Sequence, residues 1–302
     1  MICVQDLWKT FRHHDAVRGL SFSVSEGSAY ALIGANGAGK TTTLKILMNI
    51  LQPTRGTASV LGVDSSRLSL AQLNQIGYVS ENQELPERLT VAEYFDYLRP
   101  FYSAWDEPLE QSLRKQLALP ANRKIAALSH GMRMKMALAC ALPFRPRLLI
   151  LDEPFSGLDP LVRDEFMDGL VNQAGEMTIL ISSHELGEIE GFATHVAFLE
   201  DGRLLFDEPM SDLTARFRQI RVTLDHPAEI PEELPSNWLH FQATGNVVEF
   251  IESRYTEDWN AHLHLFFRGI HAIDADPMPL RSIFTSLARA ARASAAGSNG
   301  AS

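Results

Sequence analysis

The sequence has little cysteine, and what it has forms no recognisable pattern. Its 302 residues include two cysteines, Cys3 and Cys140, with no CxxC pair. This excludes a disulfide-rich scaffold and favours a reducing compartment. Cys140 lies within an apolar run, residues 136–142, which is typical of a small buried hydrophobic side chain.

Long hydrophobic runs are also missing. No stretch stays apolar over the roughly 18 residues that a transmembrane helix needs. The first residues lack the basic segment and the apolar segment of a secretory signal peptide. We therefore expect a cytoplasmic chain, whose role at a membrane, if it has one, comes from a partner.

Basic charge is scarce as well, with 27 Lys and Arg against 37 Asp and Glu, a net charge of −10. Nonspecific binding to nucleic acid needs clustered basic residues that replace phosphate counterions, so we expect no nucleic-acid partner. The length allows one main domain with a smaller appendage.

The first two thirds of the chain alternate between strand-like and helix-like patterns, which indicates an α/β fold. Continuous apolar runs at 29–33, 148–152 and 178–182 predict buried parallel strands. Residues 41–51 and 132–142 have apolar side chains at helical spacing. Thr90 with Glu93 predicts a capping box, and Asp201-Gly202 predicts a type I′ hairpin turn.

The pattern changes near residue 215, so we predict a main domain over 1–215 and a small α+β accessory domain over 216–302. Strand-like runs occupy 247–251 and 262–267, and Leu280, Ile283, Phe284 and Leu287 mark an amphipathic helix. Three arginines, Arg281, Arg289 and Arg292, fit a solvated helix face. We expect disorder in the Ala-, Ser- and Gly-rich tail from about residue 294.

Residues 34–41, Gly-Ala-Asn-Gly-Ala-Gly-Lys-Thr, match the phosphate-binding P-loop pattern between a predicted strand and a predicted helix. Glycines let the backbone N–H groups point inward at an anion, and the helix adds its positive dipole end. Lys40 can reach the β- and γ-phosphates of a nucleotide, and the Thr41 hydroxyl can bind Mg²⁺. The remaining candidates for nucleotide contacts are Gly34, Asn36, Gly37, Ala38, Gly39 and Thr42.

Two carboxylates, Asp152 and Glu153, follow the predicted strand 148–152. Ligands of open α/β sheets bind beyond that end of a strand. We expect Asp152 to help hold Mg²⁺ and Glu153 to orient or deprotonate an attacking water. Taken alone, such a pair is as often a solvated turn as a functional site. The presence of the P-loop makes the functional interpretation the favoured one.

These motifs resemble the nucleotide-binding domain of the ABC transporter superfamily over roughly residues 1–215. The resemblance implies a P-loop NTPase core with a mostly parallel sheet, an antiparallel β edge and a helical subdomain over about 84–145. It implies that Phe11 stacks on adenine and that His184, after Ser183, is the switch histidine. Residues 128–132, Leu-Ser-His-Gly-Met, match the signature motif, in which Ser129 and Gly131 approach the γ-phosphate. Residues 156–159 look like the D-loop and end in Asp159.

The chain departs from the family pattern at the signature and at the Q-loop. His130 and Met132 stand where the family has Gly and Gln. Glu81 takes the position of the Q-loop glutamine and can serve as a Mg²⁺ ligand or hold the water, while Gln83 lies close enough to replace it. Taken singly, Phe11 is more typical of a core residue, His184 of an ordinary histidine, and Ser129 of a helix N-cap. Only the order in which the motifs follow one another along the chain favours a role in a nucleotide site.

The resemblance also implies partners. We expect a second ATP-binding subunit that closes an ATP sandwich, and a polytopic membrane permease. The aromatic stretch 95–105 is either a docking anchor for the permease or the core of its own subdomain. Residues 276–284 are similar to the tail of ATPases that serve ABC-2-type exporters, which favours export. The alternatives are a soluble ABC ATPase without a transport role and a weakly hydrolysing regulatory subunit.

Overall fold

The computed structural model describes residues 1–174, 177–185, 187, 189–231, 233–256, 258–287 and 289. The chain divides into two compact units, Met1–Asp207 and Glu208–Ser302. The boundary predicted near residue 215 lies at the end of α7 (Met210–Arg216), which belongs to the second unit. Arg292 and the predicted tail from about residue 294 lie outside the described residues.

A six-stranded sheet forms the centre of the first unit, in the order β10-β9-β3-β8-β7-β6. Strands β9, β3, β8, β7 and β6 pair in parallel. The strands are β3 (Ala29–Ile33), β6 (Ile76–Ser80), β7 (Leu148–Asp152), β8 (Thr178–Ser183), β9 (His195–Glu200) and β10 (Arg203–Pro209). Every residue of β7 and β8 is buried, as expected of strands covered on both faces.

The turn between β9 and β10 has the predicted geometry. Asp201 and Gly202 both have positive φ, 47° and 77°. Two consecutive left-handed residues are the requirement of a type I′ turn, so the hairpin prediction is confirmed.

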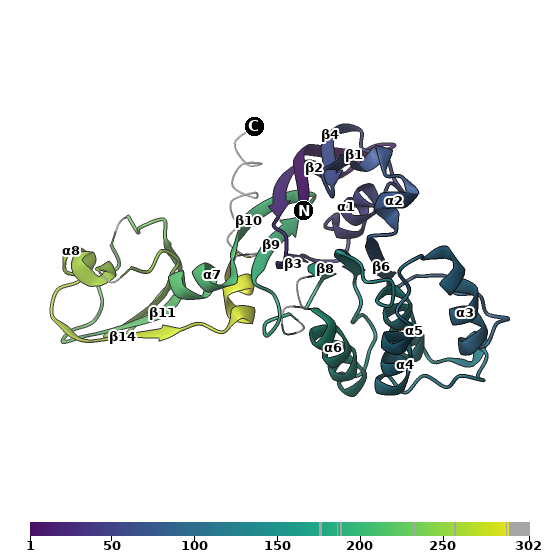
Figure 1. Cartoon of the computed structure of the whole chain (residues 1–302). Helices are drawn as coiled ribbons and strands as arrows, with labels where there is room; N and C mark the ends of the chain where they lie inside the picture. The colour runs from purple at the N-terminus through teal and green to yellow at the C-terminus, as the bar shows by residue number, and fades with distance from the viewer. Residues whose placement is uncertain are drawn as a thin grey trace. The chain divides into compact units, whose positions relative to one another are not determined.

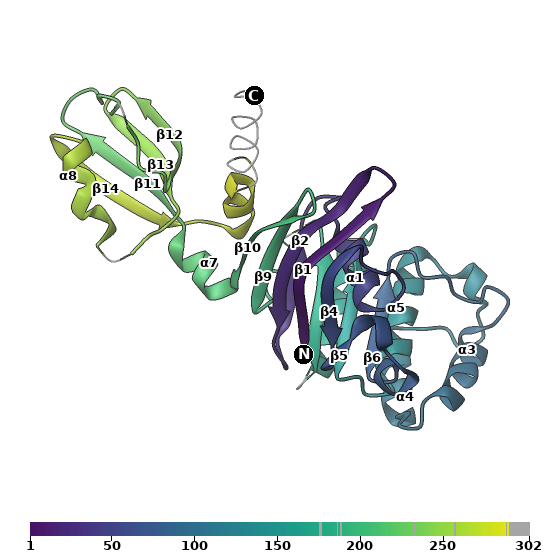
Figure 2. The same ribbon diagram turned by 90° about the horizontal axis from the view of Figure 1, so that it is seen from above.

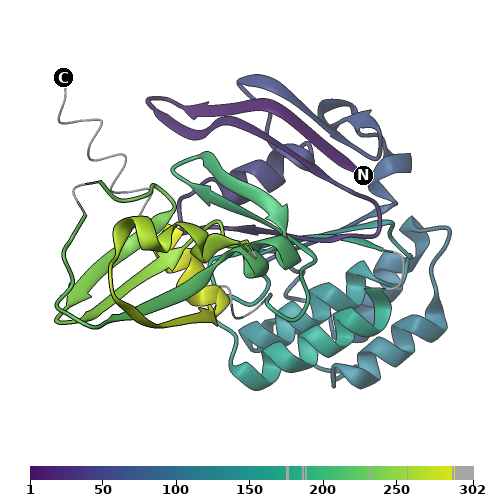
Figure 3. The same ribbon diagram turned by 90° about the vertical axis from the view of Figure 1, so that its left-hand side faces the viewer.

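A second, antiparallel sheet lies on one side of the central sheet, together with α1 (Lys40–Leu47), and the helical part described below lies on the other side (Figures 1 and 3). Its strand order is β2-β1-β4-β5. The strands are β1 (Ile2–Phe11), β2 (His14–Val24), β4 (Arg55–Val60) and β5 (Val63–Asp64), with the short helices η1 (Ser65–Arg67) and α2 (Leu70–Leu73) after them.

Helix α1 (Lys40–Leu47) belongs to the hydrophobic core that the two sheets share, and Leu44 and Leu47 are fully buried there. The helix ends before the predicted position, residue 51. Asn49 has a φ of 57°, a left-handed conformation that asparagine tolerates better than most residues and that ends a helix.

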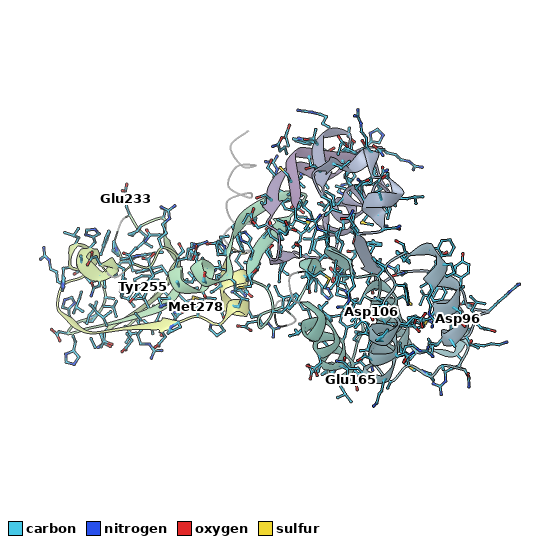
Figure 4. All side chains as sticks on the ribbon, viewed as in Figure 1. Asp96, Asp106, Glu165, Glu233, Tyr255 and Met278 are labelled. Carbon is cyan, nitrogen blue, oxygen red and sulfur yellow. The ribbon has the colours of Figure 1, made fainter. Side chains whose placement is uncertain are left out.

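The helical part of the first unit consists of α3 (Val91–Leu98), η2 (Arg99–Phe101), α4 (Glu107–Gln116), η3 (Ile125–Ala127), α5 (His130–Ala141) and α6 (Pro160–Ala174). Thr90 and Glu93 form the predicted capping box of α3. The side chain of Lys135 on α5 pairs with Glu165 on α6, which is labelled in Figure 4.

The aromatic stretch 95–105 serves both as core and as surface. Phe95 is fully buried, and the Trp105 indole donates a hydrogen bond to Glu110. Tyr97 and Phe101, by contrast, are more than half exposed and pack edge-on against each other. The inner residues therefore stabilise the helical part, and the outer pair remains available to a partner.

Glu110 is the electrostatic centre of these helices. Its fully buried carboxylate accepts hydrogen bonds from Arg99 at 2.8 Å, from Trp105 at 2.9 Å and from Arg114 at 3.1 Å. Burial acts to raise the pKa of Glu110, but these hydrogen bonds outweigh it and hold the pKa below the ordinary value.

The second unit contains a four-stranded antiparallel sheet in the order β12-β13-β11-β14 (Figure 2). The strands are β11 (Arg218–Leu224), β12 (Trp238–Thr244), β13 (Val247–Glu252) and β14 (Ile270–Pro277). One face packs against η5 (Trp259–His262) and α8 (Leu263–Phe266), and Val222 and Phe250 lie in its core. Residues 280–287 are helical, as predicted.

The strand predicted at 262–267 is wrong, because this segment is helical. Leu263 and Phe267 are buried while Leu265 is 80% exposed. The two buried positions are four residues apart, the spacing of one helix face, whereas a strand would place all three on the same face.

Within the described part of the chain, none of the helices combines the length and the apolar character that crossing a bilayer requires.

We expect Glu110→Gln to destabilise the helical part by about 2 kcal/mol, because two partly buried guanidinium groups, of Arg99 and Arg114, lose the charge of their shared buried carboxylate. Urea unfolding at pH 7 measures the loss, and amide hydrogen exchange in α3 and α4 locates it. Because the pKa of Glu110 is lowered in the fold, its contribution is present above the ordinary value of 4.5 and is lost as the pH falls through the lowered pKa. The difference in free energy of unfolding between variant and parent should therefore become smaller at acidic pH. Glu107→Gln, an exposed position on the same helix, is the control; equal effects of the two variants would contradict the assignment.

Candidate active site

The P-loop connects β3 to α1 and can be built only with glycine at two positions. A Cβ atom on Gly34 would lie 2.2 Å from the Leu199 carbonyl oxygen, and one on Gly39 would lie 2.3 Å from the Ala16 carbonyl oxygen. Gly39 also has a φ of 106°. The loop is thus held directly against the backbones of β2 and β9.

The outer part of the loop faces solvent. Asn36 and Gly37 are exposed, whereas Ala38 is buried and its N–H donates to the Ala35 carbonyl at 3.1 Å. The first N–H groups of α1, which include those of Thr41 and Thr42, have no carbonyl partner within the helix. They point out of the positive end of the helix, where an anion is favoured.

Lys40 is 4% exposed, and its ammonium is shared among three oxygens. It donates to the carbonyls of Gly34 at 2.5 Å and Ala35 at 3.1 Å. It also lies 2.9 Å from Oε1 of Glu153. The P-loop lysine and the second acidic residue after β7 are therefore in direct contact, as their predicted roles at one site require.

Asp152 is tied to the P-loop helix and to the neighbouring strand. Its Oδ1 accepts hydrogen bonds from the Thr41 hydroxyl at 2.9 Å and from the Ser182 hydroxyl at 2.8 Å. Burial raises the pKa of Asp152 above its ordinary value, against the opposing effect of these two hydrogen bonds. A cation beside this carboxylate would favour its ionised form and lower the pKa again.

Glu153 has a strained backbone conformation, with a φ of 51°. Its N–H donates to the Ser182 hydroxyl at 2.9 Å, which helps to hold this conformation. Oε2 of Glu153 lies 2.7 Å from Nδ1 of His184. Oε1 is buried and makes no hydrogen bond, although it contacts Lys40 as an ion pair. The carboxylate thus joins the P-loop lysine to the predicted switch histidine.

A cavity of about 200 Å³ opens beside these groups. Thr41, Asp152 and Glu153 line it together with both candidates from the Q-loop, Glu81 and Gln83. The N–H of Glu81 donates to the Asp152 carbonyl at 3.0 Å, which fixes the Q-loop to the end of β7. Glu81 and Gln83 both remain candidates for the third polar group of the site.

The donor set fits a magnesium ion that a nucleotide helps to hold. Mg²⁺ is bound through one or two carboxylates, waters and substrate phosphates rather than by an all-protein cage. Thr41 and Asp152 provide such a partial set. Among the described residues, no group of three or more His, Cys, Asp or Glu side chains could hold a metal ion alone.

Phe11 lies at the end of β1 and is 42% exposed. It pairs with His14 across the turn to β2, the strand whose Ala16 contacts the P-loop. The Lys9 ammonium lies 5.0 Å from the centre of one face of the ring. The ring is therefore half open to solvent rather than buried in the core, as stacking on a base requires.

The signature residues and the D-loop lie together. Ser129 caps α5 by accepting a hydrogen bond from the Met132 N–H at 3.3 Å, and Asp159 accepts one from the Val162 N–H at 3.1 Å. A Cβ atom on Gly131 would lie 2.9 Å from Val162. No hydrogen bond or ion pair between described residues joins Ser129, Gly131 or Asp159 to the P-loop.

Sequence reasoning missed Ser182, which is fully buried and holds both Asp152 and the Glu153 backbone. The signal was present, because Ser182 ends a buried strand beside the predicted acidic strand. In the parallel register Ser182 stands directly opposite Asp152. Only the pairing of β7 with β8, which cannot be read from the sequence, identifies this serine as a site residue.

Comparisons with known proteins agree with this geometry. Residues 17–156 match the model of the ABC transporter family. The chain is 33% identical over 218 residues to YxlF of Bacillus subtilis, an uncharacterized ABC transporter ATP-binding protein; the match covers 70% of this chain and 72% of that one. It is 34% identical over 226 residues to BcrA of Bacillus licheniformis, a bacitracin transport ATP-binding protein, covering 72% and 73%.

A solved structure shows the same fold. It is the ATP-binding cassette MJ0796, a dimer in a post-hydrolysis state with ADP and Pi. The TM-score is 0.63 at 23% identity, over 70% of this chain and 99% of that one. The predicted P-loop NTPase core is confirmed, and the relatives together show that this chain belongs to the ATP-binding subunits of the ABC transporter family, and is an ATPase.

Proposed function

We propose that this chain hydrolyses Mg-ATP to drive a separate polytopic membrane permease, as a cytoplasmic subunit held peripherally on the membrane by that partner. One observation carries the proposal: the contacts of Lys40, Thr41, Asp152, Glu153 and His184 bring them to one end of the parallel sheet. Phosphoryl transfer needs mainly positioned positive charge, a metal ligand and a group that orients water, and this set contains all three.

The P-loop supplies the phosphate site. The Lys40 ammonium, now shared between loop carbonyls and Glu153, turns to the β- and γ-phosphates when nucleotide is present. Backbone N–H groups and the N-terminus of α1 cover the remaining phosphate oxygens. The residues of this cradle are Gly34, Asn36, Gly37, Ala38, Gly39 and Thr42, and Phe11 stacks on the adenine.

The acidic residues supply the metal site and the base. Thr41 and Asp152 would hold Mg²⁺, with Glu81 or Gln83 as the further polar group, and the ion when bound would supply neutralising charge for the phosphates. Glu153 orients the attacking water and accepts its proton, while His184 holds the carboxylate from its other side. The water oxygen bonds to the γ-phosphorus, the bond to the β–γ bridging oxygen breaks, and ADP and phosphate leave.

We infer that two such chains form an ATP sandwich. Ser129, Gly131 and Asp159 lie together but make no bond to their own P-loop, so their place at the γ-phosphate has to be at the nucleotide of a second subunit. The helix dipole of α5, which Ser129 caps, favours an anion there. The dimer of the similar cassette MJ0796 supports this arrangement.

The transport role rests on the family and on the exposed aromatic pair. Tyr97 and Phe101, which together we call the aromatic pair, lie on the helical part with more than half of their surface exposed. Large exposed aromatic side chains are typical anchors of protein interfaces. The relationship to a bacitracin transport protein favours export. A soluble ABC ATPase would purify without a polytopic partner, so co-purification from membranes separates the two possibilities.

We expect Glu153→Gln to slow ATP hydrolysis at least 100-fold and to trap an ATP-bound dimer, because Gln cannot accept the proton of water yet keeps nearly the same shape. Phosphate release and size-exclusion chromatography with light scattering measure both effects. A monomer at saturating ATP would refute the sandwich. Glu185→Gln, two residues along the chain from Ser183, is the control variant.

We expect Asp152→Asn to abolish Mg-dependent hydrolysis and yet to leave the nucleotide-free protein as stable as the parent or more so. The Asn carbonyl can accept both hydrogen bonds, from Thr41 and Ser182. Because the pKa of Asp152 is raised in the fold, ionisation opposes folding as the pH rises above the ordinary value of 3.8. Thermal unfolding at pH 7.5 tests this; a clear fall in melting temperature would show that the carboxylate stabilises the fold instead.

We expect Ala substitution of both Tyr97 and Phe101 to reduce co-purification of the permease at least ten-fold while ATP affinity stays unchanged, since the aromatic pair touches no site residue. Pull-down from detergent-solubilised membranes and nucleotide titration give the two readings. Leu70→Ala removes an even more exposed apolar side chain from α2 and is the control. If the pull-down is unaffected by the double substitution, the aromatic pair is not the anchor.

A further inference from the structure

The residue that departs most from the family signature makes a specific contact. Nε2 of His130 lies 3.1 Å from the carbonyl oxygen of Ser156, the first residue of the D-loop. A carbonyl oxygen can only accept a hydrogen bond, so Nε2 carries the hydrogen and donates it. The side chain next to Ser129 in the sequence is thereby bonded to the segment that ends at Asp159.

The surroundings of the imidazole fit this contact. Gly157 has a φ of 67° and faces the ring, so that a Cβ atom there would lie 3.7 Å from Cδ2 of His130. Beside it, Gly131 packs so tightly that a Cβ atom would meet Val162 at 2.9 Å and Leu158 at 3.5 Å. The first turn of α5 is therefore docked on the D-loop by close packing and one directed hydrogen bond.

The same segment leads to the catalytic end of the site. The N–H of Ser156 donates to the carbonyl of Glu153 at 3.2 Å, and the N–H of Leu158 donates to the carbonyl of Phe155 at 3.1 Å. The peptide between Ser156 and Gly157 thus lies between two anchors. One is the turn that begins at Glu153, and the other is the His130 side chain on α5.

We propose that His130 is a positioning residue that fixes the D-loop to the signature helix of the same chain. A glycine at this position has no side chain and cannot make this bond. Two elements that the proposed sandwich directs at the partner's nucleotide, Ser129 and Asp159, then move as one unit. The inference rests on the proposed function, because its effect on catalysis requires the sandwich.

The contact itself can be tested without nucleotide. In the apo protein, His130→Ala should speed amide hydrogen exchange at residues 156–159 at least five-fold, because the segment loses one of its two anchors. Exchange in α1 should not change. His264→Ala, an exposed histidine of the second unit, is the control and should alter neither region. Unchanged exchange at 156–159 in the His130 variant would overturn the proposal, whatever the ATPase does.

The catalytic consequence is read from kcat and nucleotide affinity separately. We expect His130→Ala to lower kcat about ten-fold while ATP affinity, measured by titration of the dilute chain, changes less than two-fold, because the P-loop site is untouched. His130→Gln carries a side-chain N–H that can reach the same carbonyl, and it should recover most of kcat. Equal losses in the two variants would show that a side-chain N–H at this position does not restore kcat, and would overturn the role given to the hydrogen bond.

The two readings separate the hypotheses. Faster exchange at 156–159 with no change in kcat would leave the contact in place but remove its role in catalysis, and so would overturn the positioning proposal. If the parent chain itself forms no ATP-dependent dimer, the proposed sandwich fails, while the exchange result still decides whether His130 holds the D-loop.

Discussion

The site depends on one buried ion pair, in which Nζ of Lys40 lies 2.9 Å from Oε1 of Glu153. Removing an ammonium and a carboxylate from water costs several kcal/mol each unless close partners compensate. Lys40 therefore also donates to two carbonyls of its own loop, and Glu153 is also bonded to His184. A phosphate group brings a stronger negative partner for the same ammonium, so that nucleotide binding would exchange one charge pair for another and release the carboxylate for water.

Glu153 reaches this position because of the parallel pairing of β7 with β8. The register sets Asp152 opposite Ser182, and the Ser182 hydroxyl then bonds to both Asp152 and the Glu153 N–H. These bonds stabilise the left-handed backbone conformation of Glu153. For a residue other than glycine, that conformation costs of order 1–3 kcal/mol. From this strained turn the carboxylate reaches Lys40. A shift of this register would separate the proposed base, Glu153, from Lys40.

The sequence predicted those features that depend on local geometry. The P-loop glycines, the capping box at Thr90 and the type I′ turn at Asp201-Gly202 each require particular residues within a few positions, so pattern alone identifies them. Contacts between distant segments left no such pattern. Ser182 and the contact of His130 with Ser156 became visible only in the fold. The segment 262–267 failed for a different reason, because its apolar positions fit strand and helix spacing equally well and burial of Leu263 and Phe267 decided the outcome.

The loop from Glu153 to Asp159 connects the phosphate site to the region of the signature helix. Its first residue carries the carboxylate that contacts Lys40, and its last residue caps the start of α6 near the signature helix. Turn hydrogen bonds at Ser156 and Leu158 keep the intervening residues compact, so we expect a displacement at one end to shift the other. Exchange of the Glu153 ion pair for a phosphate would thus affect the surface that the proposed sandwich directs at a second subunit. The coupling needs no separate domain motion, because a seven-residue loop with both ends bonded has little freedom to relax independently.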